Sequence, residues 1–505
     1  MLPTIPNPAD YDISLDTGFV SEDLPLTRLS NPYYDPWEAT ASNLQFLVMT
    51  RQIRSVIDSP SFPVLSISRL RSISERRRAY SILGFLAHAY IWAGPSASDE
   101  LPEAIARPLV QLSEILEVLP LATYAGLCLW NHRPLFADQT DPKFLDLSNL
   151  ATLHTFTGSI DESWFYLVST AIEIRGAACL QFLLDAMHAC RADASHDVVV
   201  ALQLLAESID SLSPILSRLP EQCDPHTFYY RIRPFLAGSQ NMADAGLPHG
   251  VRYGNESEYR QYAGGSNAQS SLIQALDIGL GVHHRPTSSS SQTSSSSQSE
   301  SPSSAGPSNN FIHEMRRYMP GPHRRFLEQL ELCSNIREYV REHKSSNSAL
   351  TLAYDACLAM LRSFRDKHIQ IVSRYIILQA KKPTSTTATT TTTGSASVSH
   401  PQELSPGAFT AKRDGLAAVV VSDKKKARGT GGTALLPFLK QARDETGEPA
   451  AGSWAARLLR DDAFVAKRKM RDAMGLGEPQ QPQDGLVGLA GKWNVDDDYG
   501  GICHW

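Results

Sequence analysis

The strongest constraint on the fold is a long apolar stripe that runs without a proline or glycine from residue 349 to residue 382. Apolar residues recur there at three- and four-residue spacing, which predicts an α-helix with one buried face. A straight helix of this length would span about 50 Å. The stripe ends at Lys381-Lys382-Pro383, where two cations at the negative end of the helix dipole precede a helix breaker.

The same spacing recurs along most of the chain. Further helices are predicted at 77–94, 102–118, 162–190, 196–218 and 324–343. Strand-like alternation is rare, and LAAVVVS at 416–422 is its one good example. No period of about 20 to 50 residues recurs, which disfavours a helical solenoid. The sequence therefore predicts an all-α fold.

Composition divides the chain into parts. Extended, proline-bearing sequence at 132–160 marks a boundary between a smaller and a larger helical portion. A serine-rich tract and a threonine-rich tract cannot bury enough apolar area to fold, and they read as disordered insertions. The predicted organisation is a small N-terminal helical domain (1–150), a large helical domain (151–446) with disordered insertions near 286–308 and 383–400, and a tail of uncertain order (447–505).

Charge and cysteine content exclude several classes of protein. With 42% hydrophobic and 20% charged residues and a net charge of −6, the chain suits a soluble globular protein and lacks a nucleic-acid footprint. Its seven cysteines form no CxxC pair, which argues against a disulfide framework or a zinc cluster. The N-terminus lacks the pattern of a signal peptide, and the most apolar window, 82–94, is too short for a membrane span. We expect a cytoplasmic protein with no nucleic-acid or membrane partner.

His368 lies within the apolar stripe of the long helix. The residues on its face are Leu361, Phe364, Ile371, Val372 and Tyr375. It is either a core histidine whose two nitrogens are hydrogen-bonded or an axial ligand of a metal cofactor. HExxH is absent, and no histidine and carboxylate residues cluster convincingly. A metal-binding His368 would therefore act alone, as in haem, where a macrocycle supplies four ligands and a gas can take the sixth position.

Three other segments carry weaker signals. Phe165, Ser169, Ile172 and Gly176 share one helix face, which suits either close helix packing or room for a flat group. Among the aromatics of 225–238, a buried arginine would need a carboxylate from the protein or from a ligand. The glycine-rich segment 424–440 lacks the GK[ST] ending of a P-loop and suits a mobile lid.

Together and in this order, these segments resemble the indoleamine 2,3-dioxygenase family of haem enzymes. The resemblance covers roughly residues 20 to 445. It is carried by NPYYDPWE, LPLATYAGLCLWNHRP, FYLVSTAIEIRGA, FYYRIR, YAGGSNAQSSLIQALDIGLG, MRRYMPGPHRRFL, YDACLAMLRSFRDKHIQIVSRYI and RGTGGTALLPFLK. Eight ordered blocks form a far more specific match than any single motif.

The resemblance implies a haem b cofactor with His368 as its proximal ligand. Asp277 would be the carboxylate that supports the imidazole, and Arg365, otherwise an ordinary solvated arginine, would pair with a haem propionate. Phe165 and Ser169 would overhang the oxygen site, with no residue acting as a general base. The remaining pocket residues implied are Tyr124, Phe228, Arg233, Gly264, Gly265, Ser266 and Thr430.

In this family Arg233 would bind the substrate carboxylate, and it is preferred over Arg231 because it lies five residues after Phe228, as the family spacing requires. The implied reaction inserts both atoms of O2 across the indole C2–C3 bond of L-tryptophan. It gives N-formyl-L-kynurenine and opens the kynurenine pathway toward NAD precursors. We expect a monomer that depends on an unidentified reductant for ferric haem. The alternative is a haem-binding paralogue with poor tryptophan turnover that acts on another indole or as a sensor.

Overall fold

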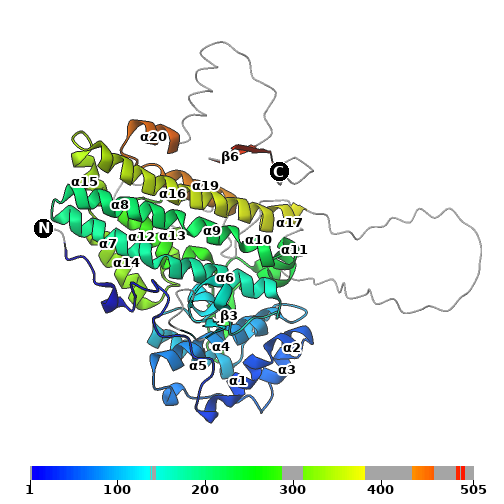
Figure 1. Cartoon of the computed structure of the whole chain (residues 1–505). Coiled ribbons are helices and arrows are strands. Elements are labelled where there is room, and N and C mark those ends of the chain that lie inside the picture. The colour runs from blue at the N-terminus through cyan, green and yellow to red at the C-terminus, as the bar shows by residue number, and fades with distance from the viewer. Residues whose placement is uncertain are drawn as a thin grey trace, which may run out of the picture.

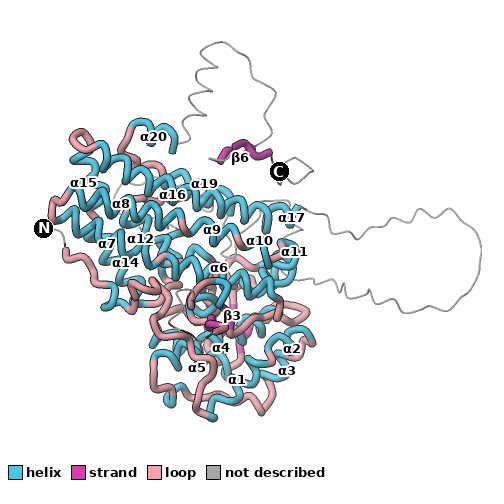
Figure 2. Tube along the Cα trace, in the orientation of Figure 1, coloured by secondary structure: helices cyan, strands magenta, loops and turns pink. Residues whose placement is uncertain are grey.

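The computed structural model describes residues 3–136, 138, 144–286, 311–381 and 435–459, and the strands at 485–488 and 491–494. Four predictions therefore lie outside the described residues: the two disordered insertions apart from Pro286, the strand at 416–422, and the position of Thr430. Helices dominate the described part of the chain (Figure 2), and the all-α prediction is confirmed.

The N-terminal helices gather at one end of the molecule, drawn in blue at the bottom of Figure 1. They are α1 (Asp35–Ser42), α2 (Leu44–Met49), α3 (Ile53–Ile57), α4 (Ile73–Trp92) and α5 (Glu103–Leu116). Helix α4 begins with a capping box, in which the Ser72 hydroxyl accepts from the Glu75 amide and the Glu75 carboxylate accepts from the Ser72 amide. The boundary of a separate domain at residue 150 stays a prediction.

Longer helices form the other end, where α7, α8 and α16 run side by side (Figure 1). The middle of the chain forms α6 (Ile160–Arg175), α7 (Ala177–Arg191), α8 (Ser195–Asp210), α9 (Leu212–Ser217), α10 (Leu219–Gln222), α11 (Pro225–Thr227) and α12 (Ser271–Gly279). It is followed by α13 (Phe311–Arg316), α14 (Gly321–Cys333), α15 (Ile336–His343), α16 (Ser348–Val372), α17 (Leu378–Lys381), α19 (Leu435–Thr446) and α20 (Ser453–Leu459).

The predicted long helix is present and has one irregularity. Asn347 caps its start by accepting from the Leu350 amide at 3.1 Å. Helix α16 runs to Val372, a π-helical turn follows at Ser373–Ile377, and α17 continues to Lys381. The single predicted helix at 162–190 is instead two helices, α6 and α7, which meet at Gly176. A Cβ atom at Gly176 would lie 2.1 Å from a Leu272 methyl group, so this glycine allows α12 to pack closely.

The described strands are short. β1 (Glu100–Leu101) pairs in parallel with β4 (Val251–Tyr253), which pairs antiparallel with β5 (Tyr259–Arg260). β2 (His132–Pro134) and β3 (Leu150–Thr152) form an antiparallel pair with His132 opposite Thr152. β6 (Gly485–Gly488) and β7 (Gly491–Asn494) form another.

Part of the predicted tail docks on the long helix. The buried Asp355 carboxylate of α16 accepts from the Ala451 and Gly452 amides at 2.8 and 2.9 Å, directly before α20. Arg362 of α16 donates to the Leu459 carbonyl at the end of α20. These contacts fasten 450–459 to the helix that carries His368.

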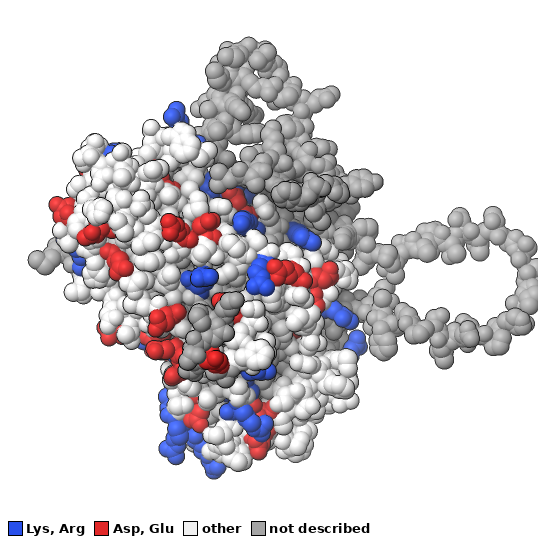
Figure 3. Space-filling view, viewed as in Figure 1, with Lys and Arg blue, Asp and Glu red and all other residues white. Residues whose placement is uncertain are grey.

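Two stretches, Ile160–Arg191 and Ser195–Gln222, are long and apolar enough to cross a membrane. Of the apolar window in the first, 72% is buried inside the protein, and of that in the second, 50%. Core helices pass the same test, so these stretches are weak evidence for a membrane protein. On the face seen in Figure 3, acidic and basic side chains both occur across the described surface, and neither sign covers it.

Candidate active site

A large apolar cavity lies between α6, α12, α16 and α19. About 1940 Å³ of space, including the part open to solvent, is not filled by protein atoms. Its walls are mainly aliphatic and aromatic, with a few polar side chains.

His368 faces this cavity from α16. Among the described residues, no hydrogen bond reaches either nitrogen of its ring, and its side chain is only half-buried because the cavity adjoins it. Burial, assisted by the nearby Arg365 charge, lowers the pKa of His368 to about 4, so the imidazole is neutral near pH 7. By contrast, His88 is an ordinary core histidine, with its Nδ1 2.7 Å from the Phe235 carbonyl oxygen. His368 does not match the hydrogen-bonded core alternative.

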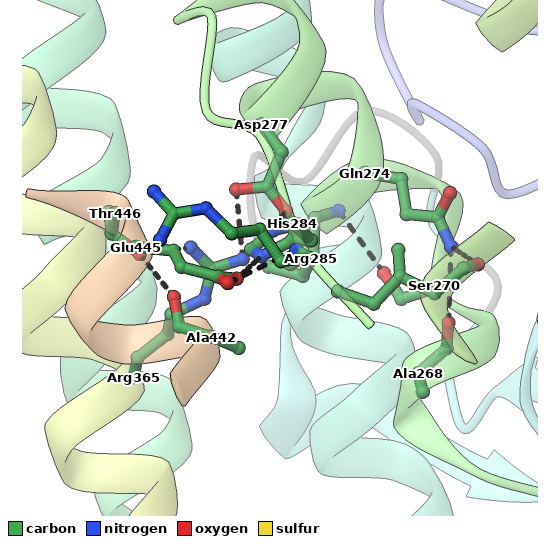
Figure 4. Close-up of polar contacts among 12 residues, drawn as sticks. Ala268, Ser270, Gln274, Asp277, His284, Arg285, Arg365, Ala442, Glu445 and Thr446 are labelled. Carbon is green, nitrogen blue, oxygen red and sulfur yellow. Dashed lines mark hydrogen bonds and ion pairs between the residues drawn. The ribbon is translucent and has the colours of Figure 1, made fainter. Parts of the chain in front are cut away.

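Arg365, one turn before His368, is an ion-pair residue rather than a solvated arginine. Its Nη2 lies 2.6 and 2.8 Å from the two Asp277 oxygens, and its Nη1 donates to the Thr446 hydroxyl (Figure 4). Burial alone would raise the pKa of Asp277, but the Arg365 and His284 charges lower it overall. Asp277 therefore contacts Arg365 and His284, and no hydrogen bond between Asp277 and His368 occurs among the described residues.

His284 extends this network to α19. Its Nε2 lies 3.0 Å from an Asp277 oxygen and its Nδ1 lies 2.7 Å from a Glu445 oxygen (Figure 4). Burial opposes the charged imidazolium, but the two carboxylates raise the pKa of His284 overall. The network holds α19 against α12 and α16, and α19 closes one wall of the cavity with Leu435, Phe438, Leu439 and Ala442.

Helix α6 forms another part of the wall. Phe165, Ser169 and Ile172 all line the cavity, whereas Gly176 packs against Leu272. The four residues of the predicted stripe therefore have two roles: the first three face the cavity, and the glycine allows another helix to pack closely. The Phe165 ring lies 4.7 Å from the Phe228 ring, measured between centroids, which makes an aromatic corner of the cavity.

A π-helical turn at Phe228–Ile232 contains Arg231 and is followed directly by Arg233. Arg233 is 5% exposed and lines the cavity, while Arg231 is exposed at the surface. The Arg233 guanidinium carbon lies 5.4 Å from the centre of the Tyr229 ring. Burial lowers the pKa of Arg233, with the Tyr229 charge opposing, but a guanidinium stays charged at neutral pH.

The loop before α12 completes the cavity. Gly265 and Ser266 line it, and Ser266 begins the short 3-10 helix at Asn267–Gln269 by accepting from the Ala268 amide. Gly264 lies behind them: its Cβ position is only 2.1 Å from the Leu236 carbonyl oxygen, so only glycine fits there. Tyr124 also lines the cavity, and its hydroxyl donates to Glu173 at 3.0 Å.

Sequence reasoning missed Glu173 and the wall formed by α19. Glu173 lies four residues after Ser169 on the same face of α6, and a carboxylate within so apolar a helix was an available signal. Segment 424–440 was predicted to be a lid loop, and its described part, from Leu435, is helical. Contacts of α19 with α12 and α16 carry no signal in the sequence.

These residues fit an iron porphyrin. A neutral imidazole, to which no described residue is hydrogen-bonded, faces an apolar space, and an arginine lies one turn away on the same helix. No group of three or more histidine, cysteine or carboxylate side chains that could hold a metal ion occurs in the described part of the chain. A macrocyclic cofactor, which needs one protein ligand, suits this donor set.

The comparison with known proteins agrees with the geometry. The sequence model of the indoleamine 2,3-dioxygenase family matches residues 7–449. The chain is 47% identical over 441 residues to an indoleamine 2,3-dioxygenase of Saccharomyces cerevisiae, covering 86% of this chain and 92% of that protein. It belongs to the indoleamine 2,3-dioxygenase family. It is therefore an oxidoreductase of a family of haem dioxygenases that use O2.

Relatives within this family differ in the substrate their names state. The chain is 34% identical over 445 residues to a 6-hydroxytryptophan 2,3-dioxygenase of Fusarium equiseti, covering 88% of this chain and 98% of that protein. It is 31% identical over 440 residues to human indoleamine 2,3-dioxygenase 2, covering 86% and 93%. Family membership thus supports indole dioxygenation and leaves the substrate to be proposed.

Proposed function

We propose that this protein inserts both atoms of O2 across the indole C2–C3 bond of L-tryptophan and releases N-formyl-L-kynurenine. One observation carries the proposal: the same apolar cavity has the neutral imidazole of His368, which no described residue hydrogen-bonds, on one wall and the buried guanidinium of Arg233 on another. An apolar ring with an attached carboxylate is the kind of ligand that such a cavity suits.

His368 would hold haem b as its one protein ligand, with Arg365 beside it to pair with a propionate. The bound haem supplies the activation of O2, as the cofactor does in oxygenases generally. Supporting roles for Asp277, Gly264, Gly265, Ser266 and Thr430 around the cofactor and the substrate belong to the same proposal. Arg365 would have to bind a propionate while keeping or exchanging its contacts with Asp277.

The chain's own contribution would be orientation and exclusion of water. Arg233 would bind the substrate carboxylate through charge-assisted hydrogen bonds. Phe165 and Phe228 would flank the indole, and Tyr124 would close the pocket beyond it. Ser169 lines the cavity beside Phe165, and its hydroxyl donates to the Phe165 carbonyl oxygen at 3.4 Å. A serine hydroxyl is a poor base, so no protein general base is proposed.

A second candidate is dioxygenation of a substituted indole, with poor turnover of tryptophan itself, or a role as a sensor. The relative named a 6-hydroxytryptophan 2,3-dioxygenase favours the substituted substrate. The polar pair Tyr124 and Glu173 in the cavity wall could accommodate a ring hydroxyl. For the first candidate we further propose a cytoplasmic, monomeric enzyme of the kynurenine pathway, which supplies NAD precursors and depends on a cellular reductant.

Isotope labelling tests the proposal. Reduced, haem-loaded protein is incubated with L-tryptophan under ¹⁸O₂, and the product is analysed by mass spectrometry beside parallel reactions with 6-hydroxytryptophan. We expect N-formylkynurenine that carries two labelled oxygen atoms. Labelled product from 6-hydroxytryptophan alone would transfer the function to the second candidate, and no product from either indole would refute both dioxygenase assignments.

A further inference from the structure

Glu173 is a buried carboxyl group that the proposed reaction does not use. It lies in the cavity wall and is 1% exposed. One oxygen, Oε1, accepts hydrogen bonds from the Tyr124 hydroxyl at 3.0 Å and from the Ser270 hydroxyl. The other oxygen, Oε2, is buried and has no hydrogen-bond partner among the residues that the structure describes. A buried carboxyl with half of its acceptor capacity unmet is costly and rarely accidental.

No cation balances Glu173 among its described neighbours. The segment around the π-helical turn Ala125–Leu129 contributes Tyr124 and Cys128. Burial raises the pKa of both side chains, so both stay neutral. The start of α12 contributes Ser270, and the N-terminal loop contributes Gly18, which packs on the Glu173 backbone. Asp277, the other carboxylate of the cavity wall, differs because Arg365 and His284 contact it.

The two hydroxyls that meet at Oε1 belong to different walls. Tyr124 precedes the π-helical turn Ala125–Leu129, and its backbone amide donates to the Gln269 side chain at 2.9 Å. Ser270 caps α12, where its hydroxyl accepts from the Ile273 amide. Through one oxygen atom, Glu173 therefore joins α6, the Tyr124 segment and the start of α12.

We propose that Glu173 is a positioning residue of the indole pocket: its ionised carboxylate holds the Tyr124 and Ser270 hydroxyls in place, and loss of its charge loosens both. This inference rests on the proposed function, because Tyr124 is the aromatic side chain assigned there to the indole. The residue acts through Tyr124 and Ser270 and is not proposed to touch the reacting atoms.

The charge of Glu173 changes within the physiological pH range. Burial raises its pKa to about 7, and the hydrogen bonds from Ser270 and Tyr124 limit the rise. Hydrogen bonds to a charged acceptor are roughly twice as strong as those to a neutral one. When Glu173 is ionised, the hydrogen bonds from Tyr124 and Ser270 are at full strength and hold the indole pocket in its binding geometry. The affinity for an indole substrate should therefore rise about fivefold as Glu173 ionises.

The test is the pH dependence of L-tryptophan binding to the haem-loaded protein, followed through the Soret band between pH 6 and pH 8. We expect the affinity of the wild type to rise about fivefold across this range and that of Glu173→Gln to change much less. Any titration of the ligand's own groups is common to both proteins and cancels in the comparison. Glu221→Gln, a surface glutamate paired with Arg218, is the matched control and should follow the wild type.

A second variant tests the direction of the effect. Tyr124→Phe removes one hydrogen bond that favours the ionised carboxylate, so the inflection should move to higher pH. An inflection that survives in Glu173→Gln would overturn the proposal, as would a wild-type profile without an inflection.

Infrared difference spectroscopy between the same pH values keeps the inference separable from the proposed function. A carboxylic acid band should disappear on raising the pH in the wild type, be absent from Glu173→Gln, and persist to higher pH in Tyr124→Phe. If these infrared bands are seen but tryptophan does not bind at any pH, Glu173 remains the titrating group. That outcome would refute both the role of Glu173 in tryptophan binding and the proposed substrate. Absence of the band would overturn the inference even if tryptophan is turned over.

Discussion

The two arginines of the FYYRIR segment offer a controlled test of how the substrate is bound. Arg233 is 5% exposed and lines the cavity, whereas Arg231, two residues earlier, is exposed. Replacing each with leucine removes the same charge from the same segment. Arg233→Leu should weaken binding of L-tryptophan strongly, and Arg231→Leu should leave it nearly unchanged.

The magnitude follows from the burial of Arg233. An interaction between charges inside this cavity is poorly screened by solvent, unlike one at the surface. A hydrogen bond to a charged group contributes about 1.5–3 kcal/mol, and the truncation also leaves the substrate carboxylate in an apolar space. A loss of about 2–3 kcal/mol corresponds to a factor of roughly 30 to 150 in kcat/KM.

Steady-state kinetics with L-tryptophan and tryptamine measure this loss. Tryptamine has the indole ring and the amine but no carboxylate, so the wild type should use it poorly and Arg233→Leu should lose little further activity toward it. Thermal unfolding of both variants checks that the cavity is intact. An unchanged KM for L-tryptophan in a folded Arg233→Leu protein, or equal losses in the two variants, would refute the assignment of the carboxylate site.

The remaining predictions concern stability. The pKa of Glu173 rises from 4.5 to about 7 on folding, so its contribution to stability is fully present below pH 4.5 and is lost as the pH rises through 7. The total loss is about 3 kcal/mol. Urea unfolding should therefore show a steeper loss of stability with rising pH in the wild type than in Glu173→Gln. Asp355→Asn should cost about 1–2 kcal/mol in the same assay, because one carboxylate oxygen that accepts a backbone amide is lost, while the exposed Asp185→Asn should cost little. Gly176→Ala should lower the melting temperature, because its methyl group would meet Leu272 at 2.1 Å; an unchanged value would contradict the close packing of α6 on α12.

The sequence predicts the helices well where their apolar periodicity is sustained. The stripe from 349 to 382 became α16, a π-helical turn and α17, in nearly one continuous run. Periodicity did not reveal that 162–190 breaks at Gly176, because a glycine within an apolar run is compatible with a continuous helix. The close approach of Leu272 of α12 to Gly176 joins positions nearly a hundred residues apart, and such a contact leaves no local signal.

The candidate site could be predicted from the sequence only where its residues form local patterns. The position of His368 in an apolar stripe and the spacing of Arg233 from Phe228 are local features. The ion pair between Arg365 and Asp277, the link from His284 to Glu445, and the wall built by α19 join segments far apart in the chain. These tertiary contacts decide which polar groups are compensated inside the cavity, and sequence patterns do not report them.

The central claim is that His368 holds a haem at which an indole is dioxygenated. The most direct measurement is the absorbance spectrum of the reduced, haem-reconstituted protein in the presence of O2 and L-tryptophan, for the wild type and for His368→Gly with and without added imidazole. We predict a Soret band and growing N-formylkynurenine absorbance in the wild type, loss of haem in His368→Gly, and partial return of the Soret band with imidazole. A His368→Gly protein that retains haem and activity without imidazole, or a wild type without a Soret band, would contradict the account.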